Sequence, residues 1–126
     1  MINPITEQRF VATCHCGAIT IAVAAYPTEI TDCNCSLCRS YGVLWAYYPA
    51  GDILSLPQAS LTDSYAWNGR YVDFHRCRNC GCITHWMPRD AARDRRGINA
   101  RLFPPDVLAA VRMRHRDGAN TGKYLD

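Results

Sequence analysis

Three short cysteine motifs are the part of this sequence most able to do chemistry. They hold seven of the eight cysteines, as C-x-C at 14–16, C-x-C-x-x-C at 33–38 and C-x-x-C at 77–80. Thiolates this close in sequence converge easily on one metal ion but bridge poorly to each other as disulfides. The spacing therefore predicts metal sites, and zinc is the metal that sulfur ligands of this kind favour.

The first and third motifs have the form of two halves of one site. Each is a pair of cysteines in a short turn followed by glycine, Gly17 in one and Gly81 in the other. Glycine accepts the positive φ that lets the following backbone N–H groups aim at sulfur. Four sulfurs complete the tetrahedral set of a closed structural zinc site. We therefore expect one structural zinc ion on Cys14, Cys16, Cys77 and Cys80.

The middle motif offers only three sulfurs, from Cys33, Cys35 and Cys38. Structural zinc sites fill four positions, whereas catalytic sites leave one open. Three thiolates on a divalent ion leave a net charge of about −1, which suits holding a further thiolate better than polarising a carbonyl. We therefore expect a second zinc ion with an open position, with these three cysteines as the catalytic group of a thiol chemistry.

Other residues could alter this second site. A protein ligand could fill the open position, and the candidates are Cys82, His75 and His85. Cys82 could instead lie near the first metal or in the core. Arg39 follows the motif directly, so it could offset the negative charge, bind a substrate carboxylate, or simply be exposed to solvent.

The segments between the motifs predict a mainly β fold in one domain, residues 1–126, with short strands folded into packed sheets. An Asn-Gly turn at 68–69 favours a hairpin between its flanking strands. Ser36 is expected to cap a short helix that ends at Gly42, and 104–110 is expected to form a helical turn. The expected extended segments are 8–12, 18–24, 43–48, 52–56, 60–67, 71–76, 83–86, 98–103 and 111–116.

Charge and hydropathy argue against a nucleic-acid-binding, membrane or exported protein. The net charge of +3, from 14 basic and 11 acidic residues, is too small to indicate a nucleic-acid partner. No apolar run approaches the roughly 18 residues of a membrane helix. The first ten residues lack the basic start and apolar centre of a signal peptide. We therefore expect a cytoplasmic protein without a membrane or nucleic-acid partner, in a compartment that keeps thiols reduced.

Taken in order, the motifs resemble the glutathione-dependent formaldehyde-activating enzyme family, which is also named for centromere protein V. The resemblance rests on C-x-C-G-A at 14–18, C-x-C-S-x-C-R at 33–39 and C-x-x-C-G at 77–81, and it covers nearly the whole chain. The stretches 98–102 and 116–120 are similar too.

This resemblance implies a β fold like that of methionine sulfoxide reductase B and a structural zinc ion on the four cysteines. It also implies a second zinc ion on Cys33, Cys35 and Cys38 that takes part in glutathione binding. The reaction of the founding enzymes joins glutathione and formaldehyde as S-hydroxymethylglutathione, and they are classed as carbon–sulfur lyases. This chain departs from them by its shorter length and by Cys82 after the Cys-Gly pair.

A non-catalytic, zinc-stabilised binding module is the alternative to an enzyme. Its recognition surface would be a stacking platform of aromatic side chains, which could equally be core residues. The fourth position of the second metal site separates the two readings, because an open position favours the enzyme and a protein ligand favours a scaffold. The aromatic residues concerned are Tyr47, Tyr48, Trp67, Tyr71 and Trp86.

Overall fold

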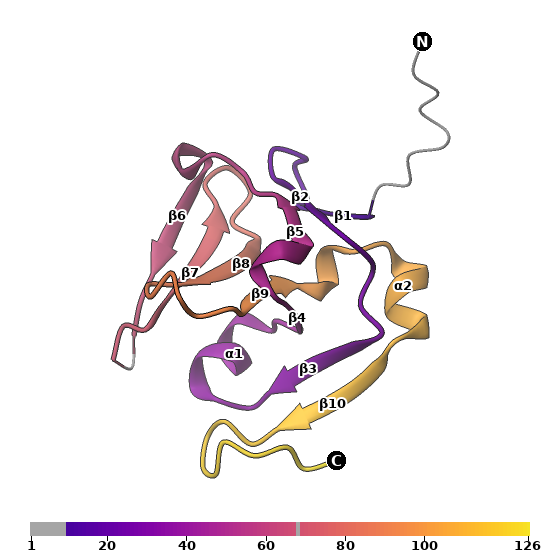
Figure 1. Cartoon of the computed structure of the whole chain (residues 1–126), viewed down its shortest axis with the longest axis vertical. Coiled ribbons are helices and arrows are strands. Elements are labelled where there is room, and N and C mark those ends of the chain that lie inside the picture. Colours follow the sequence, from indigo (N-terminus) through magenta and orange to yellow (C-terminus); the bar gives the residue numbers. More distant parts are fainter. Residues whose placement is uncertain (1–9, 68) are drawn as a thin grey trace.

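The computed structural model of the chain describes residues 10–67 and 69–126. Two β-sheets dominate it, which confirms the mainly β prediction (Figure 1). The smaller sheet has the order β1-β2-β5 and the larger one the order β10-β3-β4-β9-β8-β7-β6. The smaller sheet consists of β1 (Phe10–Thr13), β2 (Thr20–Val23) and β5 (Ile53–Ser55). The larger consists of β3 (Glu29–Cys33), β4 (Trp45–Tyr48), β6 (Thr62–Tyr65), β7 (Val72–Cys77), β8 (Ile83–Pro88), β9 (Arg96–Asn99) and β10 (Arg112–Arg116).

Helices are few and short. The α-helices are α1 (Ser36–Tyr41) and α2 (Pro105–Ala110), and the 3-10 turns are η2 (Ala50–Asp52), η3 (Ala59–Leu61) and η4 (Ala100–Leu102). Within the described part of the chain, no helix is long and apolar enough to cross a membrane.

The two faces of the larger sheet carry separate apolar clusters. Successive side chains of a strand point to opposite faces, so β4 sends Ala46 and Tyr48 into one cluster and Trp45 and Tyr47 into the other. The first cluster is shared with the smaller sheet, which contributes buried Ile21 and Val23.

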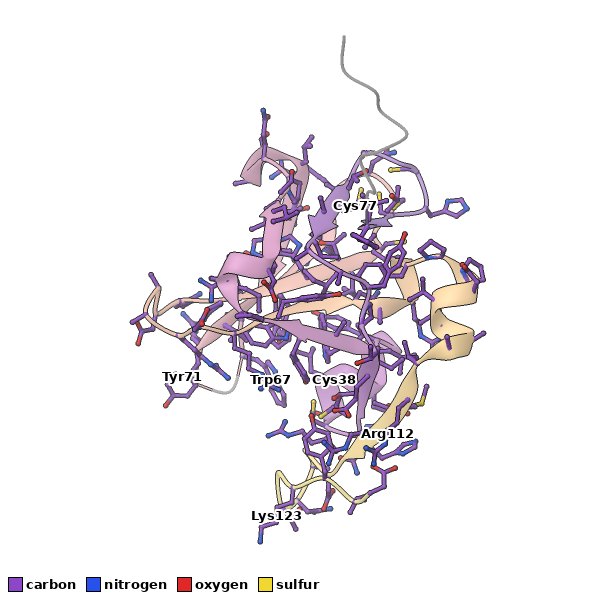
Figure 2. All side chains as sticks on the ribbon, turned by 45° about the vertical axis from the view of Figure 1, so that its right-hand side comes forward. Cys38, Trp67, Tyr71, Cys77, Arg112 and Lys123 are labelled. Carbon is purple, nitrogen blue, oxygen red and sulfur yellow. The ribbon has the colours of Figure 1, made fainter. Side chains whose placement is uncertain are left out.

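The two cysteine groups are divided between the same two clusters. Cys14 and Cys77 belong to the first cluster, whereas Cys33 and Cys38 belong to the second. Figure 2 shows Cys77 and Cys38 well apart, on opposite sides of the larger sheet. Two independent sites result, each built against its own apolar cluster.

Strand pairing goes beyond the predicted segments in one important respect. The β6–β7 pair is antiparallel, as the expected hairpin requires. Asn68 of the expected turn lies outside the described residues, and so do residues 8 and 9 of the first expected strand. In addition, residues 29–33 form a strand, β3, that pairs in parallel with β10, with Arg116 opposite Cys33 (Figure 1). Parallel neighbours need a long crossover, so this pairing joins the early and late parts of the chain.

Two local predictions need correction. The N-cap of α1 is Cys35, not Ser36, because the Cys35 sulfur accepts the backbone N–H of Cys38 at 3.3 Å. The helix ends at Gly42 with φ +66, as expected. The segment expected to be a strand over 98–103 ends as a strand at Asn99, whose side-chain oxygen accepts the backbone N–H of Arg101 and starts the 3-10 turn η4. The single-domain organisation and the likeness to methionine sulfoxide reductase B stay predictions.

Candidate metal centres and the adjoining cavity

The structure brings the four cysteines of the first predicted site together. Their sulfur atoms all lie within 4.8 Å of one another. The Cys16 sulfur lies 3.6 Å from both the Cys14 and the Cys77 sulfur. Ligands on a tetrahedral zinc ion with Zn–S bonds of about 2.3 Å are roughly 3.8 Å apart. The group, completed by Cys80, therefore has a spacing that fits zinc.

The glycines after each cysteine pair shape the two turns as predicted. Gly17 has φ +82 and Gly81 has φ +80. After the first turn, the backbone N–H of Ala18 donates to the Cys16 sulfur at 3.5 Å, and that of Ile19 donates to the Cys14 sulfur at 3.3 Å. Such N–H groups stabilise negative charge on sulfur, as metal ligands require.

Cys82 lies beside this site but belongs to neither metal-like group. Its side chain contacts that of Cys80, and it packs against the first apolar cluster. The backbone N–H of Cys82 is the main reason that the pKa of the Cys80 thiol falls to about 5. The structure thus places Cys82 near the first site and away from the second.

The three cysteines of the second site also converge, with all sulfurs within 4.8 Å of one another. Cys33 ends β3, Cys35 caps α1 and Cys38 lies within α1. The indole N–H of Trp45 donates to the Cys38 sulfur at 3.3 Å. A hydrogen bond with Cys38 is the main cause that lowers the pKa of the Cys33 thiol to about 5, and the same contact raises the pKa of Cys38. A positive charge on Arg116 further lowers the pKa of Cys33.

No fourth cysteine, histidine or carboxylate joins this group among residues 10–67 and 69–126. His75 and His85, both candidates, instead stack on each other across β7 and β8, with ring centroids 4.5 Å apart. Their Nδ1 atoms contact the hydroxyls of Thr62 and Thr84 at 3.0 and 2.8 Å. The three-cysteine group therefore has the incomplete ligand set that the sequence predicts.

A cavity of about 450 Å³ opens beside Cys35. Four of the five aromatic residues named as a stacking platform line it, whereas Tyr48 packs in the first apolar cluster. Figure 2 shows Trp67 on the same side of the molecule as Cys38, with Tyr71 farther out. The aromatic lining residues are Tyr47, Trp67, Tyr71, Phe74, Trp86 and Tyr124.

Arginine provides the charge of this cavity. Arg93, Arg95 and Arg116 line it, and none of its described lining residues is Asp or Glu. The Arg95 guanidinium lies over the Tyr47 ring, 3.9 Å from its centroid, and the Arg93 guanidinium lies 5.3 Å from that of Trp86. Arginines without acidic neighbours favour an anionic ligand, and the guanidinium plane suits a carboxylate.

The predicted arginine is not among those lining the cavity. Arg39 is exposed on α1, so its binding role stays a prediction. The three lining arginines come from the loop before β9 and from β10, and no local cysteine pattern points to them. The one signal in the sequence is Arg116 itself, which begins the late stretch 116–120 of the resemblance.

Comparison with known proteins bears on the family and the fold. A family model described as glutathione-dependent formaldehyde-activating enzyme matches residues 9–104. The fold is similar to the crystal structure of a Rhodobacter sphaeroides protein, with a TM-score of 0.65 and 29% sequence identity, over 82% of this chain and 98% of that one. The family match includes all seven cysteines of the two groups and ends before α2 and β10.

Proposed function

Since this chain belongs to the glutathione-dependent formaldehyde-activating enzyme family, we propose that it is a zinc-dependent enzyme acting on the adduct of a carboxylate-bearing thiol with formaldehyde. Glutathione is the first candidate thiol. One observation carries the proposal: the incomplete three-cysteine group adjoins a cavity that is lined by arginines and, among the residues that the structure describes, by no Asp or Glu.

Each of the two cysteine groups would hold one zinc ion. The ion on Cys33, Cys35 and Cys38 would supply a position at which a substrate thiol is held as its thiolate. Trp45 orients one of these ligands through its bond to the Cys38 sulfur. The arginines would receive the carboxylates of the thiol, and the aromatic walls would exclude water from its carbon chain.

The proposed reaction is the addition of the thiol to formaldehyde and its reverse. The thiol gives up its proton, its sulfur forms a bond to the carbonyl carbon, the C=O π electrons move to oxygen, and the oxygen takes up a proton, so that no proton is gained or lost overall. A free thiol with a pKa near 8.5 is only about 3% thiolate at pH 7. Full deprotonation can raise the thiolate population by at most about 30-fold, or roughly 2 kcal/mol.

This gain is modest, because thiols add to formaldehyde unaided. Holding the adduct in place therefore matters as much as activating the sulfur. Tyr47 in the cavity wall can take part as a neutral hydrogen-bond donor, and burial, which raises the pKa of its hydroxyl to about 12, favours this neutral form further.

Exchange NMR with ¹³C-formaldehyde and glutathione tests the proposal. Zinc-loaded protein should speed the exchange between free formaldehyde and S-hydroxymethylglutathione. Cys35→Ser should abolish the acceleration, while Cys82→Ser, outside both metal-like groups, should retain it. If the wild-type protein accelerates the exchange no more than Cys35→Ser does, the enzyme proposal fails and the alternative of a non-catalytic binding module is favoured.

A further inference from the structure

The last strand and the loop after it complete the wall of the three-cysteine group. β10 runs in parallel beside β3 and places Arg116 opposite Cys33. The backbone N–H of Asn34, between Cys33 and Cys35, donates to the Arg116 carbonyl at 3.1 Å. This part of the wall comes from beyond residue 104, where the family match ends.

A side-chain clamp holds the loop after β10 in place. The Asn34 amide donates to a carboxylate oxygen of Asp117 at 3.0 Å, and its oxygen accepts the backbone N–H of Ala119 at 2.9 Å. Asp117, itself buried, also accepts the hydroxyl of Thr121 at 3.2 Å. The residue between two candidate metal ligands thus anchors the loop that follows Arg116.

The loop backbone lies directly against the sulfur atoms. A Cβ atom on Gly118 would lie 2.5 Å from the Cys33 sulfur and 3.2 Å from the Cys35 Cβ. The Arg116 Nη1 atom lies 3.6 Å from the same Cβ position. One guanidinium nitrogen and the cysteine sulfur therefore flank a single point at the edge of the group.

Arg116 is oriented but not neutralised. Its Nε–H donates to the Gly122 carbonyl at 3.2 Å, and the guanidinium lines the cavity. No ion pair involves Arg116 within the described segments 10–67 and 69–126. Arg93 and Arg95 differ, because each lies over an aromatic ring of the cavity wall.

We propose that Arg116 selects anionic thiols at the three-cysteine group and that the Asn34–Asp117 clamp positions it for this role. The inference rests on the proposed function, in which the cavity binds a thiol. Three thiolates with a divalent cation carry a net charge of about −1, so they repel a further anion. A guanidinium at their edge offsets this charge and can donate to a carboxylate near the incoming sulfur.

Thiols that differ in charge test the selection. We would measure by calorimetry the affinity of zinc-loaded protein for 3-mercaptopropionate, an anion, and for neutral 2-mercaptoethanol. Arg116→Gln should weaken the binding of the anion by about tenfold, the equivalent of one charge-assisted hydrogen bond, and leave the affinity for the neutral thiol unchanged. Arg112→Gln, the matched control, removes an exposed arginine of the same strand that does not line the cavity, and it should change neither affinity. Asn34→Ala should weaken the binding of the anion more than that of the neutral thiol. Equal weakening of both thiols by Arg116→Gln would overturn the inference, because it indicates a structural role.

A second measurement keeps the inference testable if the wild-type protein binds neither thiol, a result that would refute the proposed function. Iodoacetate and iodoacetamide alkylate the same thiol but differ by one negative charge. Their rate ratio at Cys35, mapped by mass spectrometry on the protein as isolated, cancels changes in thiol reactivity. Arg116→Gln should lower the iodoacetate-to-iodoacetamide ratio severalfold relative to Arg112→Gln. An unchanged ratio would show that Arg116 does not attract anions to this site.

Discussion

Replacing Gly118 with alanine should push the loop after β10 off the three-cysteine group. The new Cβ would lie 2.5 Å from the Cys33 sulfur, whereas non-bonded atoms prefer about 3.5–4.0 Å. The sulfur has little freedom if it holds a metal, because metal–ligand distances vary by only about 0.2 Å. The loop must therefore move by about 1 Å and strain the two bonds to Asn34.

Overpacking of this kind costs about 1–3 kcal/mol. Gly51→Ala is the matched control, since a Cβ at Gly51 would meet no described atom within 4 Å beyond its chain neighbours, and its φ is not positive. At position 51, alanine lowers the conformational entropy of the unfolded chain relative to glycine, which should stabilise the fold by about 0.4–1 kcal/mol. The two variants should thus differ by about 1.5–4 kcal/mol, or by about 5 °C or more in melting temperature for a chain of this size.

Thermal melts at a fixed zinc concentration measure this difference. Zinc release to a chromogenic chelator provides the local readout, because Gly118→Ala should release one of its two zinc ions faster than wild type and the other at an unchanged rate. The reasoning is refuted if Gly118→Ala has the same melting temperature as Gly51→Ala and releases both zinc ions at the wild-type rate. The close approach of Gly118 to the Cys33 sulfur would then not exist.

Three further predictions concern the metals and the buried His85. Protein purified under reducing conditions should contain close to two zinc ions per chain, and a value of one without loss in handling would mean that the three-cysteine group is not a metal site. Cys77→Ser should misfold, because zinc binding contributes on the order of 10 kcal/mol to folding in small domains, whose whole stability is roughly 5–15 kcal/mol. Cys35→Ser should stay folded with one zinc fewer, and equal damage in thermal melts would contradict this difference. Burial and the neighbouring His75 lower the pKa of His85 to about 3, so stability is full above the unfolded value near 6.5 and falls as the pH drops below it, by up to about 1.4 kcal/mol per unit. The urea midpoint of His85→Gln should therefore fall less than that of wild type between pH 6 and pH 4, and parallel curves would exclude this role of His85.

The sequence predicts the two cysteine groups well because most of their geometry is local. Within each motif, neighbouring cysteines are two or three positions apart, so a single turn or helix start brings their sulfurs together. The glycines after the first and third motifs indicate the positive φ of the turns. Strand periodicity also locates most strands, since side chains alternate between two faces that differ in burial.

Periodicity says less about segments with mixed character. The strand β3 has the sequence EITDC, with polar residues at Glu29, Thr31 and Asp32, and the sequence suggests only a lead-in to the cysteines there. Its pairing with two neighbouring strands compensates for this weak pattern. Similarly, capping by the Cys35 sulfur, rather than by Ser36, depends on how the chain leaves β3.

The sequence by itself determined which cysteines belong together, where the glycine turns lie and that the fold is mainly β. Only the tertiary structure decided that Cys82 lies beside the first group, that the two histidines stack away from the second, and that Arg116 rather than Arg39 lines its cavity. The physical reason is sequence separation. Ligands two or three positions apart meet through local backbone geometry, whereas Arg116 meets Cys33 through a parallel strand pair whose partners are set by the order of strands in the whole sheet.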